Sequence, residues 1–375
     1  MFSRNLKYYR LKKNMSKKEL ASLCNVTPMT ITNYESGERK PSMDIMKQLA
    51  ISLGVKVSDF LVVRNENLVF THGEFRKNSS LTQAQQEFVR ESVEEYFSRF
   101  YSAIELLGGE VLPQFPACHA LQMTNNAEID AAELRKHLNL SSDGPIDDLI
   151  GILENKGILV FCLGLDNDKF SGMNGFVDGR PYIVINEGMT AERNRSTIVH
   201  ELAHLMFVWP ENMADKNIEN HATAIGGAFL FPKEDVIREL GIRRRYISKD
   251  MELVCAEYGV SMALLVKRAQ LCNVISQAVY TDAVEKIKSA PVESHLHILG
   301  QKERRRCHEI TDDVHSHKDR GPGGCGAPPA QPGCGFHRNG NGCGISAVSG
   351  SHQAGNAQRL HDGPDGHRGK PGFSQ

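Results

Sequence analysis

The chain has 375 residues, enough for two or three domains that each bury their own hydrophobic core. Its composition is 40% hydrophobic and 24% charged, and no apolar run approaches the roughly 20 residues of a membrane-spanning helix. Because the first residues also lack a signal-peptide pattern, the sequence predicts a cytoplasmic protein with no membrane partner.

The net charge of −1 hides an asymmetry between the two ends of the chain. Residues 1–64 contain 12 Lys and Arg against 5 Asp and Glu, a balance of +7, so the rest of the chain carries −8. An anionic partner is therefore expected at the N-terminal end.

Residues 1 to about 64 have the pattern of five short helices. Ser16 and Glu19 form a predicted capping box, since each side chain can bond the backbone N–H of the other residue. Thr27 caps the next helix, which has a proline at its first position and ends at Gly37. Two short helices joined by a compact turn predict a helix-turn-helix.

The second helix of this pair has an apolar side and a polar side. Ile31 and Tyr34 are expected to face the core, which leaves small polar side chains and Met29 free to reach base edges in the major groove. Lysine and arginine side chains beside that face would neutralise phosphates. The alternative is a helical bundle with a solvated basic surface. The predicted DNA-binding residues are Lys17, Lys18, Thr27, Pro28, Met29, Thr30, Thr32, Asn33, Arg39 and Lys40.

A family resemblance covers this whole region. The stretches Glu19-Leu20-Ala21, Val26-Thr27 and Thr30 to Ser42 resemble the XRE family of lambda-repressor-like regulators. The resemblance implies a lambda-repressor-like helical DNA-binding domain over residues 1–66. It also implies a double-stranded DNA operator as partner, bound by a homodimer.

The middle of the chain changes from a helical to a mixed pattern. One long helix is predicted from Leu81 to Leu107, and residues 67–115 are interpreted as a helical linker. Residues 116–290 predict a second domain. Its expected elements are helices over 131–138, 146–156, 193–207 and 217–231, a strand over 158–163, a hairpin around Asp178-Gly179, and three more helices up to about residue 289. The fold class is therefore mainly α with a small β-sheet.

The segment His200-Glu201-Leu202-Ala203-His204 has the H-E-x-x-H pattern. On a helix, positions i and i+4 share one face, so His200 and His204 can bind one metal ion, and Glu201 lies beside them. Apolar residues flank the motif, and a buried helix with two unpaired histidines and a carboxylate would be costly unless they served a metal. A structural zinc site is the alternative, although such sites are usually rich in cysteine.

A catalytic zinc ion needs a third protein ligand and an open position. The next predicted helix offers Glu219 and His221, which point about 200° apart and cannot both bind one metal. Glu219 shares its face with small residues that allow close helix packing, whereas His221 shares its face with large apolar residues. We expect Glu219 to be the ligand, with His221 and Asp215 as alternatives.

A second resemblance covers about residues 130 to 280. These residues resemble the ImmA/IrrE family of metallopeptidases, through the segments Gly144-Pro145-Ile146, Glu154 to Ile158, Tyr182 to Asn186, Arg193 to His204, Ile218-Glu219, Phe229 to Pro232 and Gly259-Val260-Ser261. The resemblance favours a carboxylate as third ligand and implies a zincin-like peptidase that cuts a DNA-bound repressor. One departure is Ala222-Thr223, where the family commonly has Ala-Asn or Ala-Asp.

These observations predict a transcriptional regulator with a zinc-dependent endopeptidase domain. Its expected metal ligands are His200, His204 and Glu219, its cofactor is Zn²⁺, and Glu201 is the general base. Its expected substrate is an XRE-type repressor, whose cleavage would induce stress, phage or mobile-element genes. Two alternatives are a transcription factor with a catalytically silent sensor domain and an antitoxin-type regulator.

Residues 291–375 differ in composition from everything before them. From residue 294 onward the chain holds 16 of the 33 glycines and 9 of the 15 histidines, with little apolar periodicity. Its four cysteines form no Cys-x-x-Cys pair, which argues against a zinc module. This segment is predicted to be disordered or an artefactual, out-of-frame C-terminus.

Overall fold

The structure is a computed structural model that describes residues 1–73, 81–109, 111–165 and 170–289. The predicted tail, residues 291–375, lies outside the described residues. All described residues belong to one compact unit. They are mostly helical, with one four-stranded and one two-stranded sheet, which confirms the predicted fold class. None of the helices in this part of the chain is long and apolar enough to cross a membrane.

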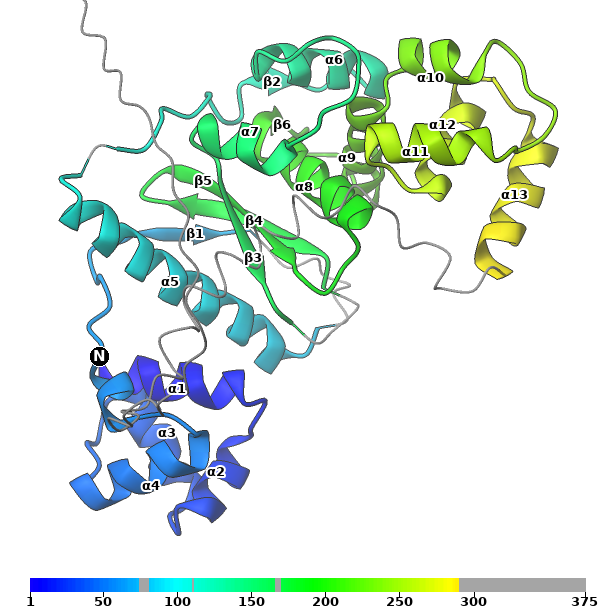
Figure 1. Cartoon of the computed structure of the whole chain (residues 1–375). Helices are drawn as coiled ribbons and strands as arrows, with labels where there is room; N and C mark the ends of the chain where they lie inside the picture. Colours follow the sequence, from blue (N-terminus) through cyan, green and yellow to red (C-terminus); the bar gives the residue numbers. More distant parts are fainter. Residues whose placement is uncertain (74–80, 110, 166–169, 290–375) are drawn as a thin grey trace, which may run out of the picture. The chain divides into compact units, whose positions relative to one another are not determined.

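Five short helices make up the N-terminal region, as predicted (Figure 1). They are α1 (Phe2–Lys12), α2 (Lys17–Leu23), α3 (Pro28–Ser36), α4 (Met43–Leu53) and the 3₁₀ helix η1 (Val57–Leu61). Their shared core contains Leu6, Leu20, Ile31, Leu49 and Phe60, all fully buried. Every side chain of this core comes from the first 61 residues, either from these helices or from the turns between them.

The ends of these helices follow from local sequence. Ser16 and Glu19 form the predicted capping box, with the Glu19 carboxylate accepting from the Ser16 amide at 2.7 Å. Thr27 caps α3, and Gly37 ends it with a left-handed φ of 82°, which glycine adopts without steric cost. At each of these helix ends, the residues that bond the free backbone groups or end the helix lie within a few positions in the sequence. The local sequence is therefore sufficient to predict where these helices begin and end.

A four-stranded sheet lies at the centre of the following region. Its strands, in spatial order, are β1 (Phe70–His72), β4 (Gly172–Val177), β5 (Arg180–Asn186) and β3 (Leu159–Leu163). Within this sheet, β3 and β5 pair in parallel, and the other two pairs are antiparallel. The β4–β5 hairpin turns at Asp178 and Gly179, which have φ values of 49° and 77°. Two positive φ values match a two-residue hairpin turn, as predicted from Asp-Gly.

Helices cover both faces of this sheet (Figure 1). On one face, Val93 and Phe97 of the long helix α5 (Gln83–Leu106) pack against Phe161 and Tyr182. On the other face, Ile183 and Ile185 of β5 pack against helices that follow α5 in the chain. The segment predicted as a helical linker thus supplies both β1 and α5 to the sheet.

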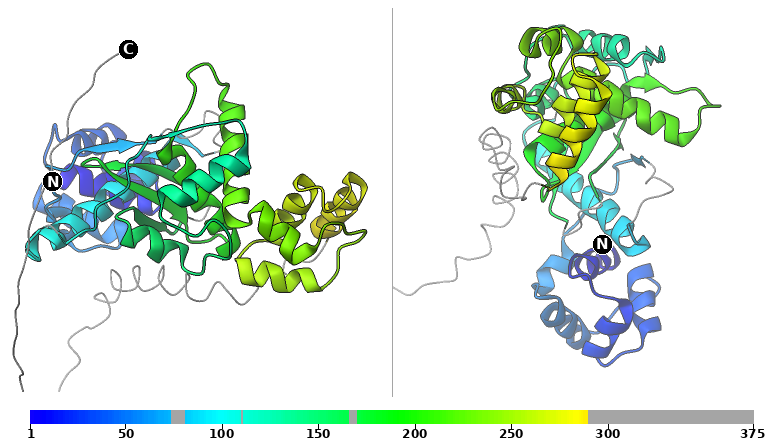
Figure 2. Two further views of the ribbon diagram at one scale, coloured as in Figure 1. Left: turned by 90° about the horizontal axis from the view of Figure 1, so that it is seen from above. Right: turned by 90° about the vertical axis from the view of Figure 1, so that its right-hand side faces the viewer.

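The remaining helices follow in chain order. They are α6 (Ala127–His137), α7 (Leu149–Asn155), α8 (Ala191–Met206), α9 (Asp215–Leu230), α10 (Lys233–Leu240), α11 (Asp250–Tyr258), α12 (Met262–Leu271) and α13 (Gln277–Ser289). The short strands β2 (Leu121–Gln122) and β6 (Phe207–Val208) pair in parallel. The last four helices lie together beyond the end of α9 (Figure 2).

The prediction of three helices after α9 was wrong, because the structure has four. Gly241 and Gly259, with φ values of 80° and 60°, end α10 and α11 and divide this stretch into short helices. Such breaks are easily missed, because the apolar residues on either side still recur at helical spacing.

Candidate metal centre and recognition helix

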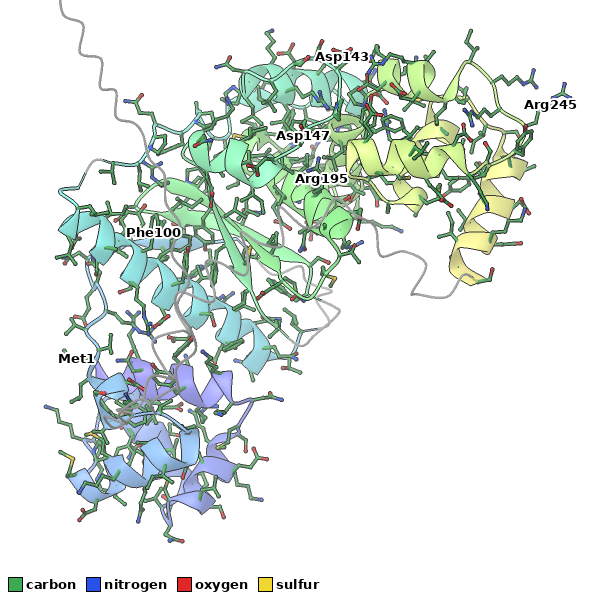
Figure 3. All side chains as sticks on the ribbon, viewed as in Figure 1. Met1, Phe100, Asp143, Asp147, Arg195 and Arg245 are labelled. Atoms are coloured by element: carbon green, nitrogen blue, oxygen red, sulfur yellow. The ribbon has the colours of Figure 1, made fainter. Side chains whose placement is uncertain are left out.

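Helix α8 carries the H-E-x-x-H motif and is buried over most of its length. Thr190 caps its start by accepting from the Arg193 amide, and His200 and Glu201 are 7% and 8% exposed. The buried guanidinium of Arg195 donates to the Ile146 carbonyl at 2.5 Å and so fixes the helix to a neighbouring loop (Figure 3). The motif is therefore held on a rigid element.

Three of the predicted site residues meet at one point. His200 Nε2 lies 3.2 Å from His204 Nε2 and 3.2 Å from Glu219 Oε2, and His204 Nε2 lies 3.4 Å from Glu219 Oε1. The side chains of His200, His204 and Glu219 are 9%, 19% and 27% exposed. This gradient leaves one side of the cluster accessible to solvent.

Helix α9 lies close to α8 at Gly226. A Cβ atom there would lie 3.7 Å from the His200 backbone nitrogen and 3.8 Å from the Ser196 carbonyl oxygen. A methyl group would still fit there in ordinary van der Waals contact, whereas a side chain larger than alanine would crowd the backbone of α8. The small residues expected on this face of α9 are therefore the ones that face the motif helix.

The cluster fits a zinc ion. In a tetrahedral site with Zn–N and Zn–O distances of about 2.0–2.2 Å, neighbouring ligand atoms are about 3.3–3.6 Å apart. The separations of 3.2, 3.2 and 3.4 Å are close to that range. Among the described residues, only these three form a group of His, Cys, Asp or Glu side chains able to hold a metal ion.

The electrostatics of the cluster keep its carboxyl group charged. Burial alone would raise the pKa of Glu219, but hydrogen bonds and charge from His200 and His204 outweigh burial and lower the pKa well below its usual value. Glu219 is consequently ionised at neutral pH, the form that binds a metal.

Glu201 is oriented by a residue that sequence reasoning missed. Asn174 Nδ2, on β4, donates to Glu201 Oε2 at 2.7 Å. Strand β4 comes this close to α8 because of Gly172, where a Cβ atom would lie 2.5 Å from Thr197 Cγ2. The amide fixes one carboxylate oxygen and leaves the other, Oε1, for chemistry. A lone asparagine in a strand carries no signal in the sequence for this role.

His221 lies away from the cluster. Its Nε2 is 2.6 Å from Asp130 Oδ2 on α6, and Asp130 is fully buried. The ring of Trp209 contacts both His204 and His221, with centroid distances of 5.5 and 6.2 Å. Asp215 is exposed at the start of α9 and is not in the cluster.

Helix α3 is the second helix of the helix-turn-helix, the one expected to reach base edges, and we call it the recognition helix. It has the expected apolar and polar sides. Ile31 and Tyr34 are 0% and 3% exposed, whereas Met29 is 66% exposed. Thr30, Thr32 and Asn33 are half-buried, and Thr27 and Pro28 are exposed. The Thr27 and Thr30 hydroxyls lie 2.9 Å apart, and Thr32 donates to the Pro28 carbonyl at 3.2 Å.

The basic residues beside α3 differ in their surroundings. Lys18, Arg39 and Lys40 are exposed, while the Lys17 ammonium group lies 3.6 Å from the Glu35 carboxylate. Glu35 also pairs with the buried Arg10 of α1, at 2.5 Å. This pair, which the sequence did not suggest, ties the recognition helix to the first helix.

The fold and the two sites define a helix-turn-helix regulator that carries a metallopeptidase-like domain. A family model described as "Helix-turn-helix" matches residues 6–60, and one described as "IrrE N-terminal-like domain" matches residues 153–270. A relative from Methanocaldococcus jannaschii, described as an uncharacterized HTH-type transcriptional regulator, is 33% identical over 61 residues, covering 16% of this chain and 92% of the relative. The chain belongs to the helix-turn-helix regulators, and residues 153–270 are similar to the IrrE N-terminal-like domain, which confirms both resemblances.

One solved structure shows a much weaker similarity. It is the crystal structure of Bacillus thuringiensis PlcR in complex with the peptide PapR7 and DNA. The alignment covers 85% of this chain and 99% of the PlcR chain, at 11% identity and a TM-score of 0.15. A similarity of that size supports no argument about fold or function.

Proposed function

We propose that the chain is a DNA-binding transcriptional regulator with a zinc-dependent endopeptidase site. The observation that carries the proposal is the convergence of His200, His204 and Glu219. Glu201 follows His200 directly on α8, and its carboxylate is held by a hydrogen bond from Asn174. Two neutral nitrogens, one carboxylate and an accessible side are the ligand set of a catalytic zinc ion, not of a closed structural site.

The residues have separate roles in peptide hydrolysis. His200, His204 and Glu219 would hold Zn²⁺, which when bound supplies Lewis-acid activation of water and of the scissile carbonyl. Glu201 accepts the proton of the attacking water at Oε1 and then delivers it to the leaving amine. Asn174 keeps Oε2 in place, so the carboxylate does not rotate between the two transfers.

In this proposal the N-terminal region binds a DNA operator, and the form that binds is a homodimer. Its support is the balance of +7 over residues 1–64 together with the exposed side of α3. We assign DNA binding to residues 1–66 and peptide hydrolysis to residues 116–290, connected through residues 67–115. The substrate proposed for the peptidase is an XRE-type repressor, and its cleavage would induce the genes that it represses.

The deciding experiment measures cleavage and zinc content together. The purified full chain, loaded with Zn²⁺, is incubated with purified XRE-type repressors. Glu201→Gln keeps both imidazoles, so zinc content stays near one per chain while cleavage falls about 100- to 10,000-fold. Glu211→Gln is the matched control, because Glu211 is an exposed glutamate just beyond the motif helix, and it retains full cleavage.

Two results would contradict this proposal. Cleavage that survives Glu201→Gln removes Glu201 from the reaction. A wild-type chain that binds zinc but leaves every tested repressor intact favours a catalytically silent domain.

A further inference from the structure

Thr223 lies next to the metal centre on α9, four residues after Glu219. Its hydroxyl group donates to the Glu219 backbone carbonyl at 2.8 Å. The same oxygen lies 3.2 Å from Nδ1 of His200, the ring atom opposite the one that faces the cluster. One hydroxyl group therefore contacts two of the three proposed metal ligands.

The proton count decides the direction of both hydrogen bonds. A threonine hydroxyl has one proton to donate and two lone pairs to accept with. The Glu219 carbonyl oxygen can only accept, so the hydroxyl proton goes to it. Toward His200 the hydroxyl oxygen must then accept, which requires a proton on Nδ1. Metal binding displaces the proton with which Nε2 bonds Glu219 Oε2, 3.2 Å away, and the neutral imidazole that keeps its proton on Nδ1 then offers its lone pair on Nε2 to the metal.

The second histidine of the motif is held differently. The His204 side chain is 19% exposed against 9% for His200, and its ring packs on Trp209. Within the described part of the chain, the structure gives Nδ1 of His204 no hydrogen-bonding side chain. The two ligands are therefore not equivalent, and His200 is the one fixed by the protein.

We propose that Thr223 is a positioning residue that fixes the tautomer and ring orientation of His200 for metal binding. It also couples His200 to the backbone of Glu219, so that ligands from α8 and α9 move together. This inference rests on the metal site of the proposed function. Outer-shell partners of metal-binding histidines typically contribute about 10- to 100-fold to metal affinity, and a neutral hydroxyl group is expected near the lower end.

The test compares four forms of the full chain: wild type, Thr223→Val, Thr223→Ser and Thr281→Val. Thr223→Val keeps the branched shape and removes the hydroxyl group, whereas Thr223→Ser restores it. Thr281→Val is the matched control, because the Thr281 hydroxyl also donates to the carbonyl four residues earlier, at 3.0 Å, but lies on α13. Zinc affinity is measured by competition with a chromogenic chelator.

We expect Thr223→Val to bind zinc about 10-fold more weakly, with wild-type affinity in the other two variants. NMR of the zinc-loaded protein provides a second readout. The Nδ1 proton of His200 is protected from solvent exchange in wild type and in Thr223→Ser, and it exchanges faster in Thr223→Val. A purely structural role would leave this proton unchanged.

The outcomes separate the two proposals. A wild-type chain that binds no zinc overturns the metal site, and this inference with it. If wild type binds zinc and Thr223→Val binds equally well, only the role of Thr223 is overturned. Equal losses in Thr223→Val and Thr281→Val, or no recovery in Thr223→Ser, also overturn it.

Discussion

Helices α3 and α8 both present functional side chains, but they are held in opposite ways. Helix α3 has nine residues, its caps come from its own neighbours in sequence, and the polar side that it offers is partly exposed to solvent. Helix α8 has 16 residues and is buried over most of its length. Its motif becomes a three-ligand site only through α9. A surface for recognition can be encoded locally, whereas a metal centre requires long-range packing.

The largest expected effect is the loss of zinc affinity when the ligand that α9 contributes to the metal centre is removed. Glu219→Ala removes a direct ligand, so zinc affinity should fall by more than the roughly 100-fold upper limit for an outer-shell partner. His221→Ala should keep its zinc, because His221 contacts Asp130 instead of the cluster. Zinc content after dialysis checks both variants.

His221→Gln serves as a second variant in case the alanine form is unstable. Retention of zinc in Glu219→Ala together with its loss in His221→Ala would show that the ligand assignment is wrong.

The next effect concerns the solvent-facing side of α3. Asn33→Ala is expected to reduce discrimination between an operator and a scrambled duplex by about 1–3 kcal/mol, through lost base contacts. Lys40→Ala should weaken binding to both duplexes alike. It should also reduce the slope of log affinity against log salt concentration by about one released counterion. Fluorescence anisotropy at several salt concentrations measures both quantities, and binding by wild type that does not respond to salt would contradict the prediction.

The smallest effect tests how local the stability of α3 is. Thr27→Ala removes the hydroxyl group that accepts from the Thr30 amide at 3.2 Å, at a cost of about 1 kcal/mol in the free energy of unfolding of the N-terminal helices. Thr27→Ser should retain the cap. Denaturant titration gives the difference, and zinc affinity is expected to stay the same in both variants. A fall in zinc affinity would mean that the two regions are not independent.

The sequence predicted those parts of the fold that local chemistry determines. The capping box at Ser16, the Asp-Gly hairpin and the inward positions of Ile31 and Tyr34 all depend on residues a few positions apart. The facing of Glu219 toward the motif helix was also predictable, because helical periodicity and small neighbours were enough to choose its side.

Other parts of the site could not be predicted from local patterns. Asn174 reaches Glu201 across 27 residues, and Asp130 reaches His221 across 91. In both pairs the two residues are too far apart in sequence for any local pattern to link them. The contacts form only when β4 packs against the motif helix α8 and α6 packs against α9. Thr223 was noted as a departure from the family pattern, but its hydrogen bond to His200 appears only in three dimensions.

The position of Glu219 on α9 also has a consequence for the order of events during protein synthesis. The core of the first five helices is complete once about residue 61 has left the ribosome, because all of its members lie before that point. The metal ligands cannot assemble until α9, which ends at Leu230, has also emerged. At about 5–20 residues per second, translation of the intervening segment takes on the order of ten seconds. A nascent chain thus completes its N-terminal core before the proposed zinc ligands can meet, so the proposed function makes metal loading a late step in maturation.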